Sequence, residues 1–568
     1  MSRTGREALI EQLRADGVRY IFGNPGTVEQ GFLDALEKAE DIEYILALQE
    51  AVVVGIADGY ARATRKPTVV QLHSGVGLGN GIGMLYQAMR GHAPLVVLAG
   101  DAGVQYDAME AQMAADLVGM ARPVTKWATR VTHPTSLLRT IRRAVKVATT
   151  PPYGPVFVAL PADVLDAPNT EEVRPSIHLH TRVAPSAEEI TRIAELLIDG
   201  EAPLIVMGDG VTFAGAQPEL QRVAQLLGAQ VWGADSSEVN FAADLPQFGG
   251  LTGHMFGYHS EPIMKAADRV LVTGTYLLPE VYPTLENIFA PDAKVVHIDL
   301  DHDAIAKNHP VDLAYLADPK PTLALLADEL ERLMTPQQRA AAEVRNARLR
   351  EQAEKRRAEE EARDASYHDQ LPLHASLFAQ EVAARMGSDV IIFDEAITTS
   401  PEIVRYLQPT QPGRYFQTRG GSLGVGIPGA LGVKLAYPDS PVVAFVGDGG
   451  SMYTIQALWT AVRHHIDATF VICNNGGYEI LKQNIQEWMK WVELPPHDYP
   501  KSFDLAVPPI HFTLLAESMG VPGIRVEKPE DIAPAVNRMV EHRGPLLIDL
   551  VIANRVRDLR DIAGAAKA

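Results

Sequence analysis

The chain has 568 residues, with 51 Lys or Arg against 71 Asp or Glu, so its formal net charge is −20. This acidic balance argues against a nucleic-acid-binding protein and against docking on anionic lipid by charge. Hydrophobic residues make up 46%, as in globular proteins, and Cys473 is the single cysteine, which excludes an intramolecular disulfide framework. The sequence shows neither the apolar core of a signal peptide nor an apolar run that could span a bilayer. We therefore expect a cytoplasmic protein of three or four domains.

Short apolar runs alternate with helical patterns along three stretches of the chain. Runs rich in Val, Ile and Leu predict buried strands at 44–48, 68–72, 95–99 and 156–160, then at 204–207, 230–232, 270–272 and 295–298, and finally at 390–393, 442–446, 469–473 and 546–551. Such runs without polar alternation are typical of parallel strands that are covered on both faces. We predict an α/β protein with three doubly wound parallel-sheet domains.

Changes in composition separate these stretches. Prolines punctuate a polar connector after about residue 168, so we expect a first domain at 1–170 and a second at 185–334. Residues 335–364 are dense in Ala, Glu, Arg, Gln and Lys and contain no Gly, which is typical of a long solvated helix. We expect a charged helical linker at 335–366, a third domain at 367–552 and a C-terminal tail at 553–568.

Two glycine-rich turns follow strands of the third stretch and carry the strongest chemical signal. The first is Gly447-Asp448-Gly449-Gly450, and Asn475, in Asn474-Asn475-Gly476-Gly477, follows 475 − 448 = 27 positions after Asp448. Glycines let the backbone approach phosphate oxygens, and a carboxylate beside an amide oxygen suits Mg²⁺, which proteins often share with a phosphate. Either turn alone could be a solvated loop. Because strand ends of one parallel sheet converge, the pair predicts a magnesium and diphosphate site.

This pair of motifs resembles the signature of thiamine-diphosphate (ThDP) enzymes, and the resemblance extends over essentially the whole chain. It implies a pyrimidine-binding, a middle and a diphosphate-binding domain in that order, as in acetohydroxyacid synthase, benzoylformate decarboxylase and oxalyl-CoA decarboxylase. It also implies that Asp448, Asn475 and the Gly477 carbonyl hold Mg²⁺ and that Gly449 and Gly450 approach the cofactor. The implied assembly is a homodimer or homotetramer with active sites at the subunit interface.

Glu50 is the candidate activating carboxylate. It follows the predicted strand at 44–48 and begins a helical pattern, where an acidic residue can serve only to stabilise the helix start. However, Leu46-Ala47-Leu48-Gln49-Glu50 resembles the glutamate motif of the family, in which this carboxylate exchanges a proton with the aminopyrimidine ring of ThDP. The resemblance implies that Glu50 acts on ThDP held by the other subunit.

Four further residues are candidates for cofactor contacts. Leu423 resembles the bulky residue that bends ThDP, and Gly421 would offer its carbonyl to the aminopyrimidine, although both could be ordinary core and turn residues. Thr398 could donate its hydroxyl to the diphosphate or could cap a helix. Ile480 follows the second glycine turn, and the resemblance places it in the wall of the pocket.

Two loops of the first stretch, 23–27 and 71–75, resemble the substrate loops of benzoylformate decarboxylase. Thr27 and Asn80 are candidates for substrate binding. His73 could act as an acid or base, since imidazole titrates near neutrality, or could be only a structural hydrogen-bonding residue. One departure is clear, because the segment 275–281 contains no counterpart of the middle-domain histidine of those decarboxylases. This departure argues against simple 2-keto-acid decarboxylation.

Two further features concern the substrate side of the site. Glu493 follows two tryptophans and precedes two prolines. Apolar surroundings would desolvate this carboxylate and suit a proton shuttle, whereas a surface helix end would give it no role. The other feature is a set of C-terminal arginines that could contact CoA phosphates as a lid or could belong to a frayed end: Arg555, Arg557 and Arg560.

Over its whole length the sequence looks most similar to the actinobacterial 2-hydroxyacyl-CoA lyases, and on that resemblance Glu493 is the preferred substrate-side acid/base. The expected reaction cleaves a 2-hydroxyacyl-CoA, for example 2-hydroxyisobutyryl-CoA, to formyl-CoA and a ketone or aldehyde, reversibly as an acyloin condensation. The alternatives are a 2-keto-acid decarboxylase or carboligase of the benzoylformate type and a ThDP fold that has lost catalysis. Relatives bind FAD, ADP or no ligand in the middle domain. Asp299, at a strand end, could hold the ribose of ADP, and no motif supports FAD.

Overall fold

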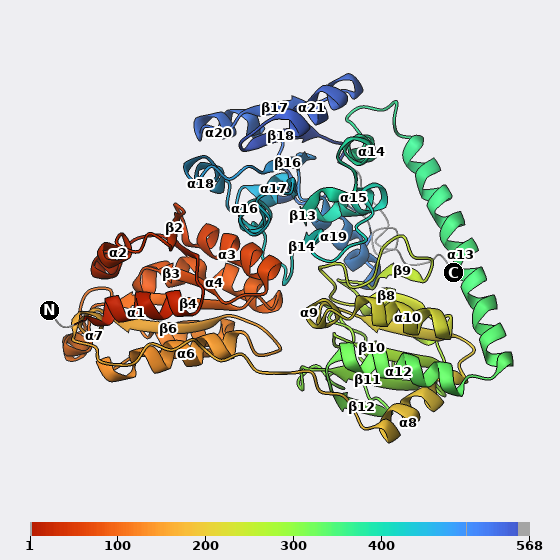
Figure 1. Ribbon diagram of the computed structural model, residues 1–568. Helices are drawn as coiled ribbons and strands as arrows, with labels where there is room; N and C mark the ends of the chain where they lie inside the picture. Colours follow the sequence, from red (N-terminus) through yellow and green to blue (C-terminus); the bar gives the residue numbers. More distant parts are fainter. Residues whose placement is uncertain (1–2, 496, 555–568) are drawn as a thin grey trace.

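The computed structural model describes residues 3–495 and 497–554 and contains three parallel sheets of six strands each (Figure 1). The strands of the first sheet, in spatial order, are β2 (Glu43–Leu46), β1 (Tyr20–Gly23), β3 (Thr68–Leu72), β4 (Leu95–Asp101), β6 (Val156–Pro161) and β5 (Trp127–Arg130). Those of the second are β12 (Leu313–Leu316), β11 (Lys294–Asp299), β10 (Arg269–Thr273), β7 (Pro203–Met207), β8 (Gln230–Gly233) and β9 (Phe248–Leu251).

The third sheet has the strand order that positions the glycine turns. Its strands are β14 (Tyr415–Gln417), β13 (Ile391–Glu395), β15 (Val442–Gly447), β16 (Thr469–Asn474), β18 (Leu546–Val551) and β17 (Gly523–Val526). The central strands are buried along nearly their whole length because helices cover both faces, which is why their sequences are continuously apolar. The predicted fold class of three doubly wound α/β domains is confirmed.

Helices cover both faces of each sheet and supply the remaining core (Figure 1). The main ones in chain order are α1 (Gly5–Ala15), α3 (Glu50–Thr64), α4 (Ser74–Arg90), α6 (Leu137–Ala148), α8 (Ala187–Ile198), α10 (Gln217–Leu227), α12 (Pro319–Leu333), α13 (Pro336–Ala365), α14 (Ala375–Met386), α15 (Ser400–Leu407), α16 (Gly426–Ala436), α18 (Ala457–Arg463), α19 (Glu479–Trp491), α20 (Phe512–Ser518) and α21 (Pro529–Glu541). No helix within the described residues is long and apolar enough to cross a membrane.

The first and third domains share one hydrophobic core because α3 packs directly on α16. Glycines bring the two helix backbones together. A Cβ atom on Gly59 would lie 2.1 Å from the Gly429 carbonyl oxygen, and one on Gly432 would lie 2.0 Å from the Ile56 carbonyl oxygen. These glycines therefore fix how the two domains of one chain sit against each other.

The charged linker forms α13, which runs along the outer edge of the middle domain to the third domain (Figure 1). Thr335 caps its N-terminus in a reciprocal hydrogen-bonded box with Gln338. Near its start, Asn346 accepts a hydrogen bond of 2.9 Å from Gln247 of the middle domain. Near its end, Glu360 pairs with Arg405 of α15 at 3.0 Å. The helix is therefore tied to one domain at each end.

Candidate active site

The two glycine turns meet at the carboxyl ends of β15 and β16, which are adjacent parallel strands. Asp448 begins the short helix α17 (Asp448–Ser451) directly after β15. Its carboxylate accepts 2.7 Å hydrogen bonds from the amides of Gly449 and Gly476, so it bridges the two turns. Burial raises the pKa of Asp448 to about 6, although these amide donors oppose the rise. A cation beside the carboxylate would offset this burial cost.

Asn475 and Gly477 complete an oxygen-rich loop beside Asp448. The Asn475 side-chain oxygen accepts from the Gly477 amide at 3.1 Å, and its side-chain nitrogen donates to Glu479 at 3.0 Å. A carboxylate, an amide oxygen and a backbone carbonyl are the hard donors that Mg²⁺ prefers. The residues present therefore fit a Mg²⁺ ion shared with a diphosphate.

A cavity of about 940 Å³ opens between the middle and third domains and reaches to α13. It is lined by all the third-domain residues predicted to hold metal or cofactor: Asp448, Asn475, Gly477, Thr398, Gly421, Leu423, Gly449, Gly450 and Ile480. The predicted set is thus brought together in one place. Gly421 adopts a φ of +73°, in the left-handed region that favours glycine, at the turn before Leu423.

Glu395 is a buried carboxylate at this cavity that sequence reasoning missed. It ends β13 and accepts 2.7 Å hydrogen bonds from the amides of Gly424 and Gly426, so it holds the loop that follows Leu423. Burial raises its pKa to about 7, although these amides lower it. The available signal was an acidic pair, Asp394-Glu395, at the end of an otherwise apolar run.

Glu50 lies elsewhere in the chain, in the first domain. It is the first residue of α3 and is buried, and its two carboxylate oxygens accept hydrogen bonds from Asn24 at 3.2 Å and Asn80 at 3.0 Å. The cavity is lined by described residues between 207 and 480, and Glu50 is not among them. One chain therefore does not bring Glu50 and Asp448 into the same site.

The other first-domain candidates gather around Glu50. A Cβ on Gly77 would lie 3.1 Å from a Glu50 oxygen and 3.3 Å from the His73 Cβ, so only a glycine separates these two side chains. His73 Nδ1 lies 2.9 Å from the buried Glu29, whose pKa is raised by burial against the effect of His73. Thr27 is exposed. It directly follows Gly26, which packs on the His73 ring.

Glu493 follows the C-terminal end of α19, and its surroundings differ from the expected ones. Its side chain is exposed, and so are Trp491 (59%) and Val492 (42%) beside it. The expectation of a desolvated carboxylate is therefore wrong for the single chain. The helix ends at Trp491 and Glu493 turns back with a φ of +57°, so the neighbouring apolar side chains project outward instead of enclosing it.

The middle domain contributes two histidines to the cavity, although the segment 275–281 has none. His254 and His259 both line it, together with Pro279. Burial lowers the pKa of His254, and the nearby Asp235 opposes that shift. In the sequence they precede the segment that would hold the family's middle-domain histidine, but the loop folds so that they reach the same cavity.

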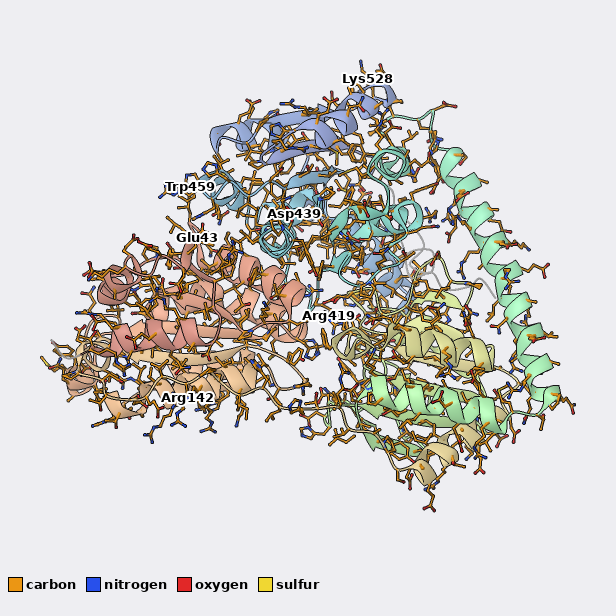
Figure 2. All side chains as sticks on the ribbon, viewed as in Figure 1. Glu43, Arg142, Arg419, Asp439, Trp459 and Lys528 are labelled. Atoms are coloured by element: carbon orange, nitrogen blue, oxygen red, sulfur yellow. The ribbon has the colours of Figure 1, made fainter. Side chains whose placement is uncertain are left out.

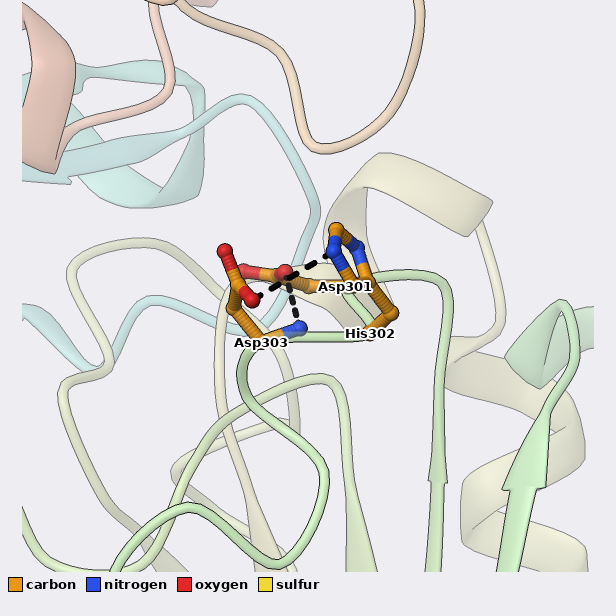
Figure 3. A group of neighbouring side chains, drawn as sticks. All are labelled: Asp301, His302 and Asp303. Atoms are coloured by element: carbon orange, nitrogen blue, oxygen red, sulfur yellow. Dashed lines mark hydrogen bonds and ion pairs between the residues drawn. The ribbon is translucent and has the colours of Figure 1, made fainter.

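Asp299, the candidate ribose ligand, ends β11 and does not line this cavity. Its carboxylate accepts a 2.8 Å hydrogen bond from the Asp301 amide, and burial raises its pKa to about 7. Figure 3 shows the adjoining turn, where His302 lies 3.3 Å from Asp303 and the Asp303 amide donates to Asp301 at 3.0 Å. His302 and Asp303 are exposed, so this acidic turn is a surface feature. Arg555, Arg557 and Arg560 lie outside the described residues.

Three protein-family models match the chain in the order of its sheets. The N-terminal TPP-binding domain of thiamine pyrophosphate enzymes matches residues 3–120, the central domain 190–326, and the C-terminal TPP-binding domain 397–550. The chain belongs to the thiamine pyrophosphate enzymes. ThDP enzymes of this family are oligomeric.

Relatives of this ThDP enzyme extend over nearly its whole length. It is 29% identical to benzoylformate decarboxylase of Pseudomonas aeruginosa over 555 residues, which cover 96% of this chain and 98% of that protein. It is 27% identical to acetolactate synthase isozyme 3 large subunit of Escherichia coli, over 95% of this chain and 92% of that one. The structure of a ThDP-dependent 4-hydroxybenzoylformate decarboxylase from Rhodococcus jostii superposes with a TM-score of 0.83 at 27% identity, covering 98% and 100%.

Proposed function

We propose that this ThDP enzyme cleaves a carbon–carbon bond next to a carbonyl carbon, with Mg²⁺ held by Asp448, Asn475 and the Gly477 carbonyl. The observation that carries this proposal is the buried Asp448 carboxylate, which bridges two glycine turns at the floor of a large cavity. ThDP, when bound, supplies the electron sink for the cleavage. The protein positions the reactants, excludes water and moves protons.

The activating carboxylate is Glu50 of a second copy of the chain. Two observations support this assignment: Glu50 is held by Asn24 and Asn80 on the first domain, and it does not line the cavity of its own chain. In the dimer that we propose, two-fold symmetry brings each first domain against the third domain of its partner, so that both sites are equivalent. In that position Glu50 would exchange a proton with the aminopyrimidine ring, and Gly421 and Leu423 would hold that ring.

For the substrate we propose a 2-hydroxyacyl-CoA, cleaved to formyl-CoA and a ketone or aldehyde. The support is the cavity, whose 940 Å³ reaches the upper end of the range for bound small molecules and extends from Asp448 to Arg350 of α13. A small keto acid beside the cofactor would leave much of this space unused. Glu493 or His73 takes the proton of the 2-hydroxyl group, and Thr27 and Asn80 contact the acyl part.

A 2-keto-acid decarboxylase or carboligase is the second candidate, and the comparisons support it better than the first. The named relatives are benzoylformate decarboxylases and an acetolactate synthase. One structural observation also favours it, because His254 and His259 place imidazoles of the middle domain in the cavity. Either could serve as the acid/base that the segment 275–281 lacks.

One assay separates the candidates. Holoenzyme is offered a 2-hydroxyacyl-CoA and, separately, a 2-keto acid, and formyl-CoA and CO₂ are measured in both reactions. If only the thioester reacts and formyl-CoA forms, the result supports the lyase. If only the keto acid reacts and CO₂ forms, the lyase is eliminated and the decarboxylase is established.

Two further assignments belong to the same proposal. Arg555, Arg557 and Arg560 contact CoA phosphates, so truncation after Ala553 raises the KM for CoA esters and leaves ThDP affinity unchanged. Since exposed ion pairs are screened by salt, this KM also rises with ionic strength in the full-length chain. ADP binds the middle domain at Asp299, and calorimetric titration of ADP into the Asp299→Asn variant tests that contact.

A further inference from the structure

Four aromatic side chains form a cluster at the junction of the middle domain and α19, which we call the aromatic shelf: Phe256, Tyr258, Tyr282 and Trp491. Phe256 is buried at the centre and stacks between Tyr258 (5.4 Å between ring centroids, 26° between planes) and Tyr282 (5.3 Å, 18°). Trp491 meets Phe256 edge-on at 6.1 Å and lies 5.6 Å from Tyr282. The shelf therefore joins two domains through ring contacts.

The outer rings of the shelf face solvent. Trp491 is 59% exposed, Tyr282 47% and Tyr258 41%. Exposed tryptophan and tyrosine at one place on a surface are typical of binding sites, because flat rings supply contact area at low entropic cost. The shelf is also held rigidly, since the Tyr258 hydroxyl donates to Glu487 of α19 at 2.8 Å.

The shelf is continuous with the wall of the active-site cavity. Met255 and His259 line the cavity and adjoin Phe256 and Tyr258 of the shelf in the chain, and the Tyr258 ring lies 4.3 Å from the His259 ring. Pro279 also lines the cavity, three residues before Tyr282. On the other side, Ile480 lines the cavity near the start of α19, and Trp491 ends the same helix. A ligand that leaves the cavity along α19 therefore reaches the shelf.

The distance along α19 from the cavity to the shelf indicates which class of ligand could span both. Ile480 and Trp491 are 491 − 480 = 11 residues apart, which corresponds to about 16 Å along the helix axis at the α-helical rise. That is the length scale of an extended pantetheine arm, which separates a thioester carbon from the nucleotide of CoA. Purine rings stack on aromatic side chains regardless of base-edge hydrogen bonding.

We propose that the aromatic shelf stacks the adenine ring of a CoA ester whose thioester group lies at the cofactor. This inference rests on the proposed function, because it requires a CoA substrate. Trp491 is the principal stacking partner, since it is the most exposed ring of the shelf. Tyr282 supports Trp491 from the middle domain.

The test compares two ligands on holoenzyme by calorimetric titration: CoA, and pantetheine 4′-phosphate, which lacks adenine. Trp491→Ala should weaken CoA binding about tenfold or more, as loss of one base–aromatic stack predicts, and leave pantetheine 4′-phosphate binding unchanged. Trp491→Phe should restore most of the CoA affinity. Trp488→Ala is the matched control, because Trp488 is on the same helix, is 40% exposed and is not part of the shelf.

The outcomes are distinguishable. If wild-type holoenzyme binds CoA and Trp491→Ala binds it equally well, the shelf inference is wrong and the proposed CoA substrate stands. If wild-type holoenzyme does not bind CoA, the proposed CoA substrate is wrong, and the shelf inference is wrong as well. Equal losses for both ligands, or a change of oligomeric mass by light scattering in Trp491→Ala, would assign the shelf to structure or to a contact between copies and also overturn the inference.

Discussion

Arg419 of the third domain reaches Asp209 of the middle domain, with 3.0 Å between the guanidinium nitrogen and the carboxylate oxygen. Its second nitrogen lies 2.8 Å from Asp235, and its Nε donates to the Arg90 carbonyl of the first domain at 3.2 Å. Figure 2 labels Arg419 where the three domains meet. One buried side chain thus ties all three domains together, immediately before the turn that contains Gly421.

Arg419→Ala should destabilise the chain strongly, because it leaves the buried carboxylate of Asp209 without its main counter-charge. Breaking a buried ion pair by removing one partner costs about 3–5 kcal/mol. The expected result is a lower denaturant midpoint and weaker ThDP binding. Arg222→Ala is the control, since it removes an exposed arginine that pairs with Asp328 and Glu331 and should cost little. Equal effects of the two substitutions would contradict the assignment.

Asp209 should also make stability depend on pH in the acid range. Burial alone would raise its pKa, but Arg419 and the hydroxyl of Ser237 lower it to about 2. Because this lies below the unfolded value of about 4, the stabilisation is complete above that pH and disappears as the pH falls toward 2. Asp209→Asn should therefore lose about 2–3 kcal/mol at neutral pH. Its deficit should shrink as the pH is lowered from about 6 to about 3, measured by urea unfolding; a constant deficit would speak against this role.

Two inactive variants should complement each other if active sites are shared between copies. Glu50→Gln should retain fold and ThDP binding but lose most activity, and Asp448→Ala should lose Mg²⁺-dependent ThDP binding. In a hybrid dimer, one site carries both defects and the other carries neither. Mixing, unfolding and refolding the two variants should thus recover about a quarter of the wild-type activity. Sites built within one chain would give no recovery.

The metal assignment has its own readout. Asp448→Ala removes the anionic donor beside the diphosphate, so ThDP should bind no more tightly with Mg²⁺ than without it. Calorimetric titration of ThDP with and without Mg²⁺ measures this difference. The control is Asp439→Ala, which removes an exposed acidic residue of the same domain, labelled in Figure 2. Wild-type ThDP affinity in Asp448→Ala would refute the site.

Substitutions at two glycines of α4 should distinguish an effect on kcat from an effect on stability. Gly77→Ala places a methyl group 3.1 Å from a Glu50 oxygen and 3.3 Å from the His73 Cβ, whereas Gly79→Ala meets only the Met120 side chain at 3.8 Å. Alanine favours a helix over glycine by up to about 1 kcal/mol at either position. Gly77→Ala should therefore lower kcat at least tenfold without loss of thermal stability, and Gly79→Ala should keep full kcat. A normal kcat in Gly77→Ala would show that Glu50 tolerates displacement.

Most interior strands could be predicted from sequence, and most edge strands could not. The first sheet holds the exceptions, since the buried interior strand β1 was not predicted and the edge strand β2 overlaps the predicted run at 44–48. The predicted run at 68–72 coincides with β3, and the runs at 442–446 and 469–473 each fall one residue short of β15 and β16. Burial on both faces makes such strands continuously apolar. The edge strand β5 was missed because all four of its residues are half-exposed, and β14 because it has only three residues.

The same contrast applies to the site. Asp448 and Asn475 were predictable because local turns present them and the parallel sheet brings the turns together. His254 lines the cavity through a long loop, and Glu493 is exposed because of how one helix ends; no local pattern in the sequence encodes either outcome. Long-range packing decides which polar residues outside the motifs line the active-site cavity.

Helix α13 docks on the middle domain near Asn346 and on the third domain at Glu360, and no loop interrupts it between these points. Removing one residue between the two docking points would shift everything beyond it by about 1.5 Å and turn it by about 100° around the axis. Glu360 would then point away from Arg405. The number of helix residues between these two contacts is therefore constrained. Among functional variants, insertions or deletions between them should be far rarer than substitutions on the solvent face of α13.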